Sequence, residues 1–263
     1  MQLSDCRGLI TGASGGIGQA LVVRLCEGGA RLLLVGRQLE SLQALQQRYP
    51  AQLEIVQADI AEAEGRQAVL AAGRRFGGLN TLINAAGVNR FSLLEDHDEE
   101  GIAELIGLNV TATLQLTHRL LPLLRLQPRA LVVNIGSTFG SLGYPGFSAY
   151  CASKFAVRGF SEALRRELAD TQVKVLYVAP RATHTGMNAD NVVAMNDELK
   201  VAMDDPQTVA AALAEAILRE QEELYLGWPE KLFVRLNSLL PRVVDQALRK
   251  QLPVIQRFAR GKP

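Results

Sequence analysis

Tyr150 and Lys154 stand four residues apart in the run Tyr150-Cys151-Ala152-Ser153-Lys154. On a helix this spacing places both side chains on one face, one turn apart. A lysine ammonium near a phenol favours the phenolate and lowers the tyrosine pKa, as proton transfer to or from a substrate oxygen near neutral pH requires. The same spacing occurs on many solvated helices, so the pair indicates a proton-transfer site only together with motifs elsewhere in the chain.

Short apolar runs alternate with longer amphipathic ones up to about residue 180. The predicted strands are Arg7–Thr11, Arg31–Val35, Gln52–Val56, Thr81–Asn84, Ala130–Ile135 and Val173–Val178. Helices are predicted at 17–27, 39–49, 61–76, 99–126, from Tyr150 to about Ala169, and at 206–222, with a last short strand at 224–226. Strands without polar alternation are buried on both faces. The pattern therefore predicts an α/β fold, a Rossmann-like doubly wound parallel sheet of about seven strands with helices on both faces.

A glycine-rich turn, Thr11 to Gly18, joins the first strand to the first helix. Glycine permits a tight turn and lets the backbone approach a pyrophosphate at a helix N-terminus. A tight connection alone would use the same residues, but the position in a βαβ unit favours nucleotide binding. The spacing differs from the usual G-x-G-x-x-G fingerprint, and a P-loop is absent. The candidate contacts to a dinucleotide in this turn are Gly12, Ser14, Gly15, Gly16, Ile17 and Gly18.

Arg37 follows the second strand, where dinucleotide-binding folds carry either an acid for the ribose 2′-hydroxyl or an arginine for a 2′-phosphate. The acid is missing here, which favours NADP(H) over NAD(H). Alternatively, Arg37 merely starts the next helix. Asp59 and Ile60 follow the third strand, and Asp59 is expected to accept a hydrogen bond from an adenine amino group, to cap the helix starting near Ala61, or both.

With Gly12, Gly16 and Gly18 at the first turn and Tyr150 and Lys154 downstream, the chain resembles the short-chain dehydrogenase/reductase superfamily over residues 5–187. The segment Asn84, Ala85, Ala86 and Gly87 is similar to the family's N-N-A-G stretch, with Ala85 in place of the second asparagine. The resemblance implies that this stretch supports the sheet and packs along the cofactor. It also implies that Asn109 helps to hold a water leading to the catalytic lysine, although Asn109 could simply be a satisfied polar residue.

Ser137 ends the fifth strand thirteen residues before Tyr150, a separation expected if strand end and helix start flank one pocket. The resemblance implies that Ser137 binds the substrate oxygen, that Tyr150 transfers the proton, and that Lys154 binds the nicotinamide ribose and biases Tyr150 toward phenolate. Ser153 is interpreted as local packing. After the sixth strand, the resemblance assigns Pro180, Thr183 and Thr185 to the cofactor. Arg181 replaces the family's usual glycine, a departure that affects the backbone of this turn.

Residues 188–204 mix polar and apolar side chains, as a mobile lid does. Met187, Val192, Val193 and Met195 are predicted to line an apolar pocket opposite Tyr144 and Phe147, or else to form core. Residues 228–263 carry eight Lys or Arg against two acids, interleaved with apolar residues. We expect a dinucleotide-binding catalytic domain at 1–227 and a basic amphipathic helical extension at 228–263. The extension either contacts a membrane surface peripherally or packs on the domain or a dimer partner.

Composition excludes several classes of protein. The 263 residues are 48% hydrophobic and 21% charged with a net charge of +1, which gives no case for nucleic-acid partners. Three scattered cysteines and the lack of a signal peptide or long apolar run favour a cytoplasmic protein. His97, His118 and His184 are too scattered for a metal site, and none is expected.

Together these observations predict an oxidoreductase that interconverts a ketone or aldehyde and an alcohol with NADP(H). The proposed substrate is a lipophilic small molecule. The small and apolar residues of the Tyr150 helix suit the homodimers or homotetramers common in the family. The alternative is a non-catalytic NADP-binding sensor or scaffold that acts through its tail, for which an acid–base residue would be unnecessary. A dehydratase or epimerase would fit the same fold but has no specific pointer.

Overall fold

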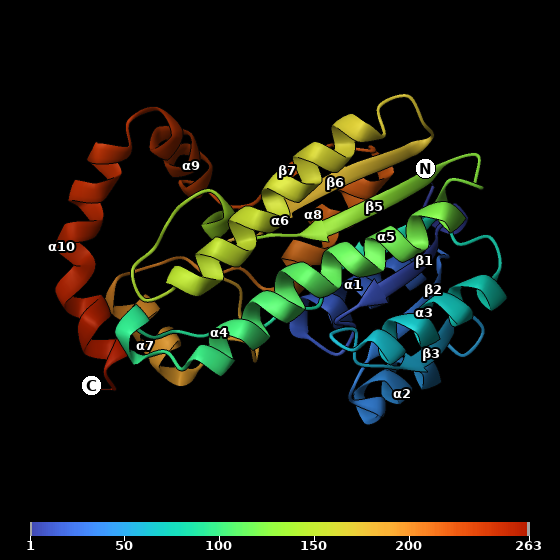
Figure 1. The fold of residues 1–263 in the computed structure, drawn as a ribbon, viewed down its shortest axis with the longest axis horizontal. Helices are drawn as coiled ribbons and strands as arrows, with labels where there is room; N and C mark the ends of the chain where they lie inside the picture. The colour runs from blue at the N-terminus through green and yellow to red at the C-terminus, as the bar shows by residue number, and fades with distance from the viewer. Residues whose placement is uncertain (1, 262–263) are drawn as a thin grey trace.

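A parallel seven-stranded sheet forms the centre of the computed structural model, which describes residues 2–261 (Figure 1). The strand order is β3-β2-β1-β4-β5-β6-β7, and every neighbouring pair is parallel. The strands are β1 (Arg7–Thr11), β2 (Arg31–Gly36), β3 (Leu53–Gln57), β4 (Thr81–Asn84), β5 (Ala130–Ile135), β6 (Val173–Ala179) and β7 (Glu223–Tyr225). The predicted α/β class and strand number are confirmed.

Helices cover both faces of the sheet, because successive residues of each strand point to opposite sides. In β1, Ile10 packs into the cluster formed with α1, α2 and α8, whereas Leu9 packs into the cluster formed with α3, α5 and α6. The helices are α1 (Gly16–Glu27), α2 (Leu39–Arg48), α3 (Ala63–Phe76), α4 (Glu99–Ile106), α5 (Thr113–Leu124), α6 (Ser148–Glu167), α7 (Asp190–Glu198), α8 (Pro206–Leu218), α9 (Glu230–Leu239) and α10 (Pro241–Ala259).

The chain changes direction across the sheet between β1 and β4. From β1 it proceeds outward to β2 and β3, and it then returns to β4 on the other side of β1. Ligands of open α/β sheets bind outside the carboxyl ends of the strands at such a switch point. Every sequence motif with candidate chemistry follows the carboxyl end of a strand or lies on a helix beside that edge.

The single helix expected over 99–126 is interrupted. α4 ends at Ile106, a π-helical turn occupies Gly107–Ala112, and α5 begins at Thr113. Asn109 lies within the turn, and its side-chain amide bonds both backbone groups of Val88. π-helical turns are rare and are frequent at functional sites. The helical periodicity of the sequence does not distinguish this wider turn from an ordinary one.

The predicted lid, residues 188–204, and the tail, residues 228–263, both contain helices. Within 188–204 the chain forms α7, and α8 ends at Leu218, earlier than expected. The tail forms α9 and α10, as predicted, at one end of the molecule (Figure 1). α10 buries Val244, Ile255 and Phe258. The predicted boundary between a catalytic domain and a tail extension at residue 227 stays a prediction. Within residues 2–261, we find no helix with the length and apolar character required to span a bilayer.

Candidate active site

Lys154 lies at the centre of the site, on the second turn of α6. Its side chain is buried, and its Nζ donates a hydrogen bond to the carbonyl oxygen of Ile135, at the end of β5, over 3.0 Å. The same Nζ lies 5.6 Å from the centroid of the Tyr150 ring. The i, i+4 spacing therefore brings Tyr150 and Lys154 together beside the carboxyl end of β5.

The predicted lowering of the Tyr150 pKa is wrong for this arrangement. Burial raises the pKa of Tyr150 to about 12, although a side-chain hydrogen bond with Ser137 acts in the opposite direction. Burial also lowers the pKa of Lys154 to about 8. Desolvation disfavours the charged form of both groups and is the largest cause of both pKa shifts. The direction of this shift favours the protonated phenol of Tyr150 at neutral pH.

Ser137 lies two residues after the end of β5, and its hydroxyl is hydrogen-bonded to Tyr150. Its Oγ accepts a hydrogen bond from Phe139 N over 3.1 Å, and its carbonyl oxygen accepts one from the Tyr177 hydroxyl over 3.1 Å. The second contact anchors the turn to β6. Ser137, Tyr150 and Lys154, predicted from separate parts of the chain, meet in one place.

Asn109 links the π-helical turn to two other segments. Its Oδ1 accepts from Val88 N over 2.8 Å, and its Nδ2 donates to Val88 O and to Ser153 Oγ. Ser153 Oγ in turn donates to the carbonyl oxygen of Tyr150 over 2.7 Å. Ser153, interpreted from the sequence as local packing, therefore also connects Asn109 to the backbone of α6. No sequence signal marked this connection.

The glycine turn after β1 is closely packed. Gly12 has a φ of +69°, and a Cβ there would lie 2.7 Å from Ala85 O and from Ala86 N. A Cβ on Gly16 would lie 2.8 Å from the methyl carbon of Thr185. No side chain caps the N-terminus of α1, whose N-cap residue is Gly15. The backbone amide groups at the start of α1 are uncapped, and the glycines of the turn present no side chain there. This arrangement fits a pyrophosphate.

The segment after β4 is hydrogen-bonded to Thr11, the residue that precedes the tight bend of the glycine turn. Ala85 N and Ala86 N both donate to Thr11 Oγ1. The buried Asn84 side chain donates to Thr117 Oγ1 and Asn134 Oδ1, so it bridges β4, β5 and α5. Asn84 thus acts on the sheet through its side chain. Gly87 lies closer to the reacting groups, because a Cβ there would be 3.6 Å from Lys154 Nζ.

Arg37 and Asp59 meet at the carboxyl ends of β2 and β3. Arg37 Nη1 lies 3.5 Å from Asp59 Oδ2, and the arginine side chain is 68% exposed. Asp59 Oδ1 accepts a hydrogen bond from Ala61 N over 2.9 Å. The predicted helix cap is wrong in detail, because α3 begins at Ala63 and Asp59 stabilises the turn before it. Ile60 is buried in the apolar cluster under α3.

The turn after β6 contains Pro180, Arg181, Thr183 and Thr185. Pro180 O accepts a hydrogen bond from Thr138 N, which joins this turn to the one that carries Ser137. Thr183 Oγ1 donates to Arg181 O, and Thr183 pairs with Asp204 in an isolated parallel bridge. Thr185 faces the glycine turn, as its proximity to Gly16 requires. These residues border the same edge of the sheet as Tyr150.

Two phenylalanine rings pack beside the ring of Tyr150. The ring centroids of Phe139 and Phe147 lie 6.4 and 6.3 Å from that of Tyr150. Apolar side chains from the lid and tail complete the cluster: Val192, Met195, Ile255 and Phe258. Val192 and Met195 thus join Tyr144 and Phe147 as predicted, whereas Met187 is 46% exposed and lies apart. The sequence analysis missed Phe139, which follows Ser137 by two residues, and the contribution of α10.

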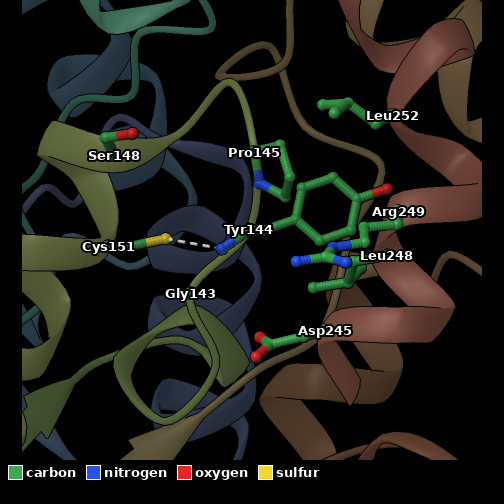
Figure 2. A pocket seen from close by; sticks show the side chains of 9 residues that line it. All are labelled: Gly143, Tyr144, Pro145, Ser148, Cys151, Asp245, Leu248, Arg249 and Leu252. Atoms are coloured by element: carbon green, nitrogen blue, oxygen red, sulfur yellow. Dashed lines mark hydrogen bonds between the residues drawn. The ribbon is translucent and has the colours of Figure 1, made fainter. Parts of the chain in front are cut away.

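A cavity of about 520 Å³ lies between α10 and the loop leading to α6 (Figure 2). Tyr144 projects from the loop toward α10, where its hydroxyl donates to Gln251 Oε1 over 3.2 Å. Cys151, next to Tyr150, lines the same cavity, and burial raises the pKa of its thiol. Opposite lie four residues of α10: Asp245, Leu248, Arg249 and Leu252. The tail therefore forms one wall of a cavity beside α6.

The chain resembles known proteins over most of its length. The family model described as short chain dehydrogenase matches residues 8–196. The chain is 31% identical over 236 residues to the 3-oxoacyl-[acyl-carrier-protein] reductase FabG of Vibrio cholerae, covering 86% of this chain and 94% of that protein.

Solved structures agree with this likeness. A short-chain dehydrogenase from Streptomyces avermitilis superposes with a TM-score of 0.81 at 29% identity, over 94% of this chain and 98% of that one. A short chain dehydrogenase from Burkholderia cenocepacia, determined in complex with NADP, superposes with a TM-score of 0.81 at 25% identity, over 94% of this chain and 99% of that one.

Proposed function

Because the chain belongs to the short chain dehydrogenase family and is an oxidoreductase of that family, we propose that it interconverts a lipophilic ketone or aldehyde and its alcohol with NADP(H). The observation that carries the proposal is the meeting of Ser137, Tyr150 and the buried Lys154 at the carboxyl end of β5. A protein that only binds a dinucleotide has no need of an acid–base group in this position.

The residues present fit a nicotinamide dinucleotide. The uncapped start of α1 and the bare backbone of Gly12 and Gly16 would hold the pyrophosphate. Arg37 would bind the 2′-phosphate, which its exposed guanidinium can reach, and Asp59 the adenine amino group. Lys154 would bind the nicotinamide ribose, and Thr185 the carboxamide. The bound nicotinamide would supply or accept the hydride.

The chain's own residues would handle the substrate oxygen and its proton. Ser137 would donate a hydrogen bond to that oxygen. Tyr150, kept protonated by a pKa raised to about 12, would give its proton to the oxygen as negative charge develops there. A phenol of this kind suits reduction of a carbonyl better than oxidation of an alcohol. The ammonium of Lys154, 5.6 Å from the ring centroid, would stabilise the phenolate left behind.

The apolar cluster around Tyr150 supports a lipophilic substrate. Phe139 and Phe147 pack against the ring, and Val192, Met195 and Ile255 extend the same apolar surface. Since pockets of this composition bind apolar groups in preference to charged ones, turnover should rise with the length of an alkyl chain on the carbonyl. We further propose that the protein acts in the cytoplasm as a homodimer or homotetramer, with its tail in peripheral contact with a membrane.

NADPH oxidation across a panel of ketones and aldehydes, including an alkyl-chain series, tests the proposal. Tyr150→Phe should lower kcat by about 100-fold or more while NADPH still binds. Tyr144→Phe is the matched control, because Tyr144 lies in the same cluster and its pKa is also raised to about 12 by burial. Equal turnover by wild type and Tyr150→Phe would overturn the mechanism. NADPH binding without turnover on the whole panel would overturn the enzymatic proposal.

A further inference from the structure

Exposed apolar side chains are concentrated in one segment of the tail. Of the eleven exposed large hydrophobic residues in the described range 2–261, six lie within 228–243. They are Trp228, Leu232, Phe233, Leu239, Leu240 and Val243. Single exposed apolar residues are ordinary on soluble proteins, but a contiguous patch indicates a surface that binds something.

Contacts with the body of the protein fix the orientation of this segment. Val234 of α9 and Val244 of α10 are buried, and Asn237 Nδ2 donates to Ser141 O over 3.0 Å. These contacts hold one side of the helix pair on the body. Leu232 and Leu239 are seven residues apart on α9, so they share the helix face opposite the buried Val234, and Val243 is exposed in the first turn of α10.

Positive charge accompanies the apolar residues. Lys231, Arg235 and Arg242 are exposed among them. The acid at the start of α9, Glu230, pairs with Arg181 at 3.3 Å and so leaves the outer side cationic. An apolar helix face bordered by Lys and Arg is the pattern of helices that lie in the interface of an anionic bilayer.

A second copy of the chain suits this surface less well than a bilayer does. A two-fold interface brings the same patch of both copies together. The cationic border formed by Lys231, Arg235 and Arg242 would then be buried against the same border of the other copy, and like charges brought together in an interface are unfavourable. Anionic headgroups satisfy the cations while the acyl region accepts the apolar side chains.

We propose that residues 228–243, the outer surface of α9 and the turn into α10, dock the protein on an anionic lipid bilayer. This deepens the tail contact in the proposed function and does not depend on the reaction. The docking surface is also connected to the candidate active site, because α10 lines the cavity beside α6 and places Ile255 in the cluster around Tyr150. The docking surface on α9 therefore continues directly into the helix that forms the wall of the apolar site.

Co-sedimentation of the full chain with vesicles tests the proposal. Binding is expected to phosphatidylcholine vesicles that contain phosphatidylglycerol, not to pure phosphatidylcholine, and to fall at high salt. Trp228 is the single tryptophan of the chain, so its emission reports the contact directly. The emission should shift to shorter wavelength only with the anionic vesicles.

Two matched pairs of variants localise the surface. Leu239 and Leu126 are both 78% exposed, but Leu126 lies outside the tail. Leu239→Glu should weaken vesicle binding by about ten-fold or more, and Leu126→Glu should not. Arg242→Glu should likewise weaken binding, whereas Arg74→Glu on α3 should bind as wild type does.

Three results would overturn the proposal. The first is negligible binding by wild type, and the second is equal binding by Leu239→Glu and wild type. The third is a change of oligomeric state in Leu239→Glu but not in Leu126→Glu, which would make the surface an interface between copies. Carbonyl reduction with a soluble substrate, measured without vesicles, should be unchanged in Leu239→Glu. A failure of docking is thereby distinguished from a failure of the enzymatic function.

Discussion

Arg181 Nη2 lies 2.7 Å from Asp204 Oδ1, and the two side chains are only 16% and 15% exposed. The same guanidinium pairs with Glu230 at 3.3 Å. Arg181 follows β6, Asp204 ends the lid segment and Glu230 begins α9. One arginine, at the position where the family usually has glycine, therefore joins the cofactor-side turn to the lid and to the tail.

We predict that Arg181→Ala lowers the free energy of unfolding by about 3 kcal/mol, because it leaves two largely buried carboxylates without their cation. Urea denaturation measures the change. The control is Arg219→Ala, which removes an exposed i, i+4 pair with Glu215 on α8 and should cost no more than about 0.5 kcal/mol. Similar losses in the two variants would show that burial gives the Arg181 network no added importance.

The meeting of Ser137, Tyr150 and Lys154 was predictable because these residues are close in sequence or follow a strand. Tyr150 and Lys154 share a helix face, and Ser137 follows the strand before that helix. The chain's buried strands could be read from unbroken apolar runs, and all seven predicted strands agree with the structure to within one residue at each end. The Arg181 network was not predictable, since Asp204 and Glu230 are 23 and 49 residues away in sequence.

Burial was the other quantity that the sequence could not supply. The Tyr150 pKa was expected to fall because a lysine is near, but its direction depends on how much water reaches both groups. Phe139 and Phe147 pack against the Tyr150 ring, and Ile255 of α10 belongs to the same apolar cluster. They come from three segments that no local pattern connects.

Gly12 should be the least replaceable residue of the glycine turn. Its φ of +69° disfavours any L side chain, and a Cβ would lie 2.7 Å from backbone atoms of Ala85 and Ala86. Gly12→Ala should therefore destabilise the fold by about 2 kcal/mol or more and abolish NADPH binding. At Gly15, an added Cβ has one neighbour, Gly12 O at 3.4 Å. Gly15→Ala should cost less than about 1 kcal/mol. Equal costs, measured by urea unfolding, would contradict this explanation.

Arg37 should decide between the two nicotinamide cofactors. Arg37→Asp removes the cation for a 2′-phosphate and introduces an acid suited to a free 2′-hydroxyl. The ratio of kcat/KM for NADPH to that for NADH should fall by about 100-fold. Arg48→Asp, at an arginine of similar exposure at the end of α2, should leave the ratio unchanged. An unchanged ratio in Arg37→Asp would mean that Arg37 does not contact the cofactor.

Lys154 should make stability depend on pH in an unusual direction. Burial lowers its pKa from 10.5 to about 8, so between these values the unfolded chain holds a proton that the folded protein has released. The free energy of unfolding therefore gains from this residue as pH rises through that window, and the gain is about 3 kcal/mol when complete. Below about pH 8, the folded protein carries the charge of Lys154 in a buried site, and the gain in the free energy of unfolding is absent.

The contribution of Lys154 can be isolated by comparison with Lys154→Met, which has no ionisable group there. Buried thiols act in the opposite direction in both proteins, because burial raises the pKa of Cys6 to about 11 and of Cys26 to about 12. Their effect cancels when the unfolding free energies of wild type and variant are subtracted at each pH. The difference should move in favour of wild type from about pH 7 to pH 9.5. A difference that stays constant across this range would mean that Lys154 remains fully charged in the folded protein, and that its contact with Ile135 O compensates for its burial.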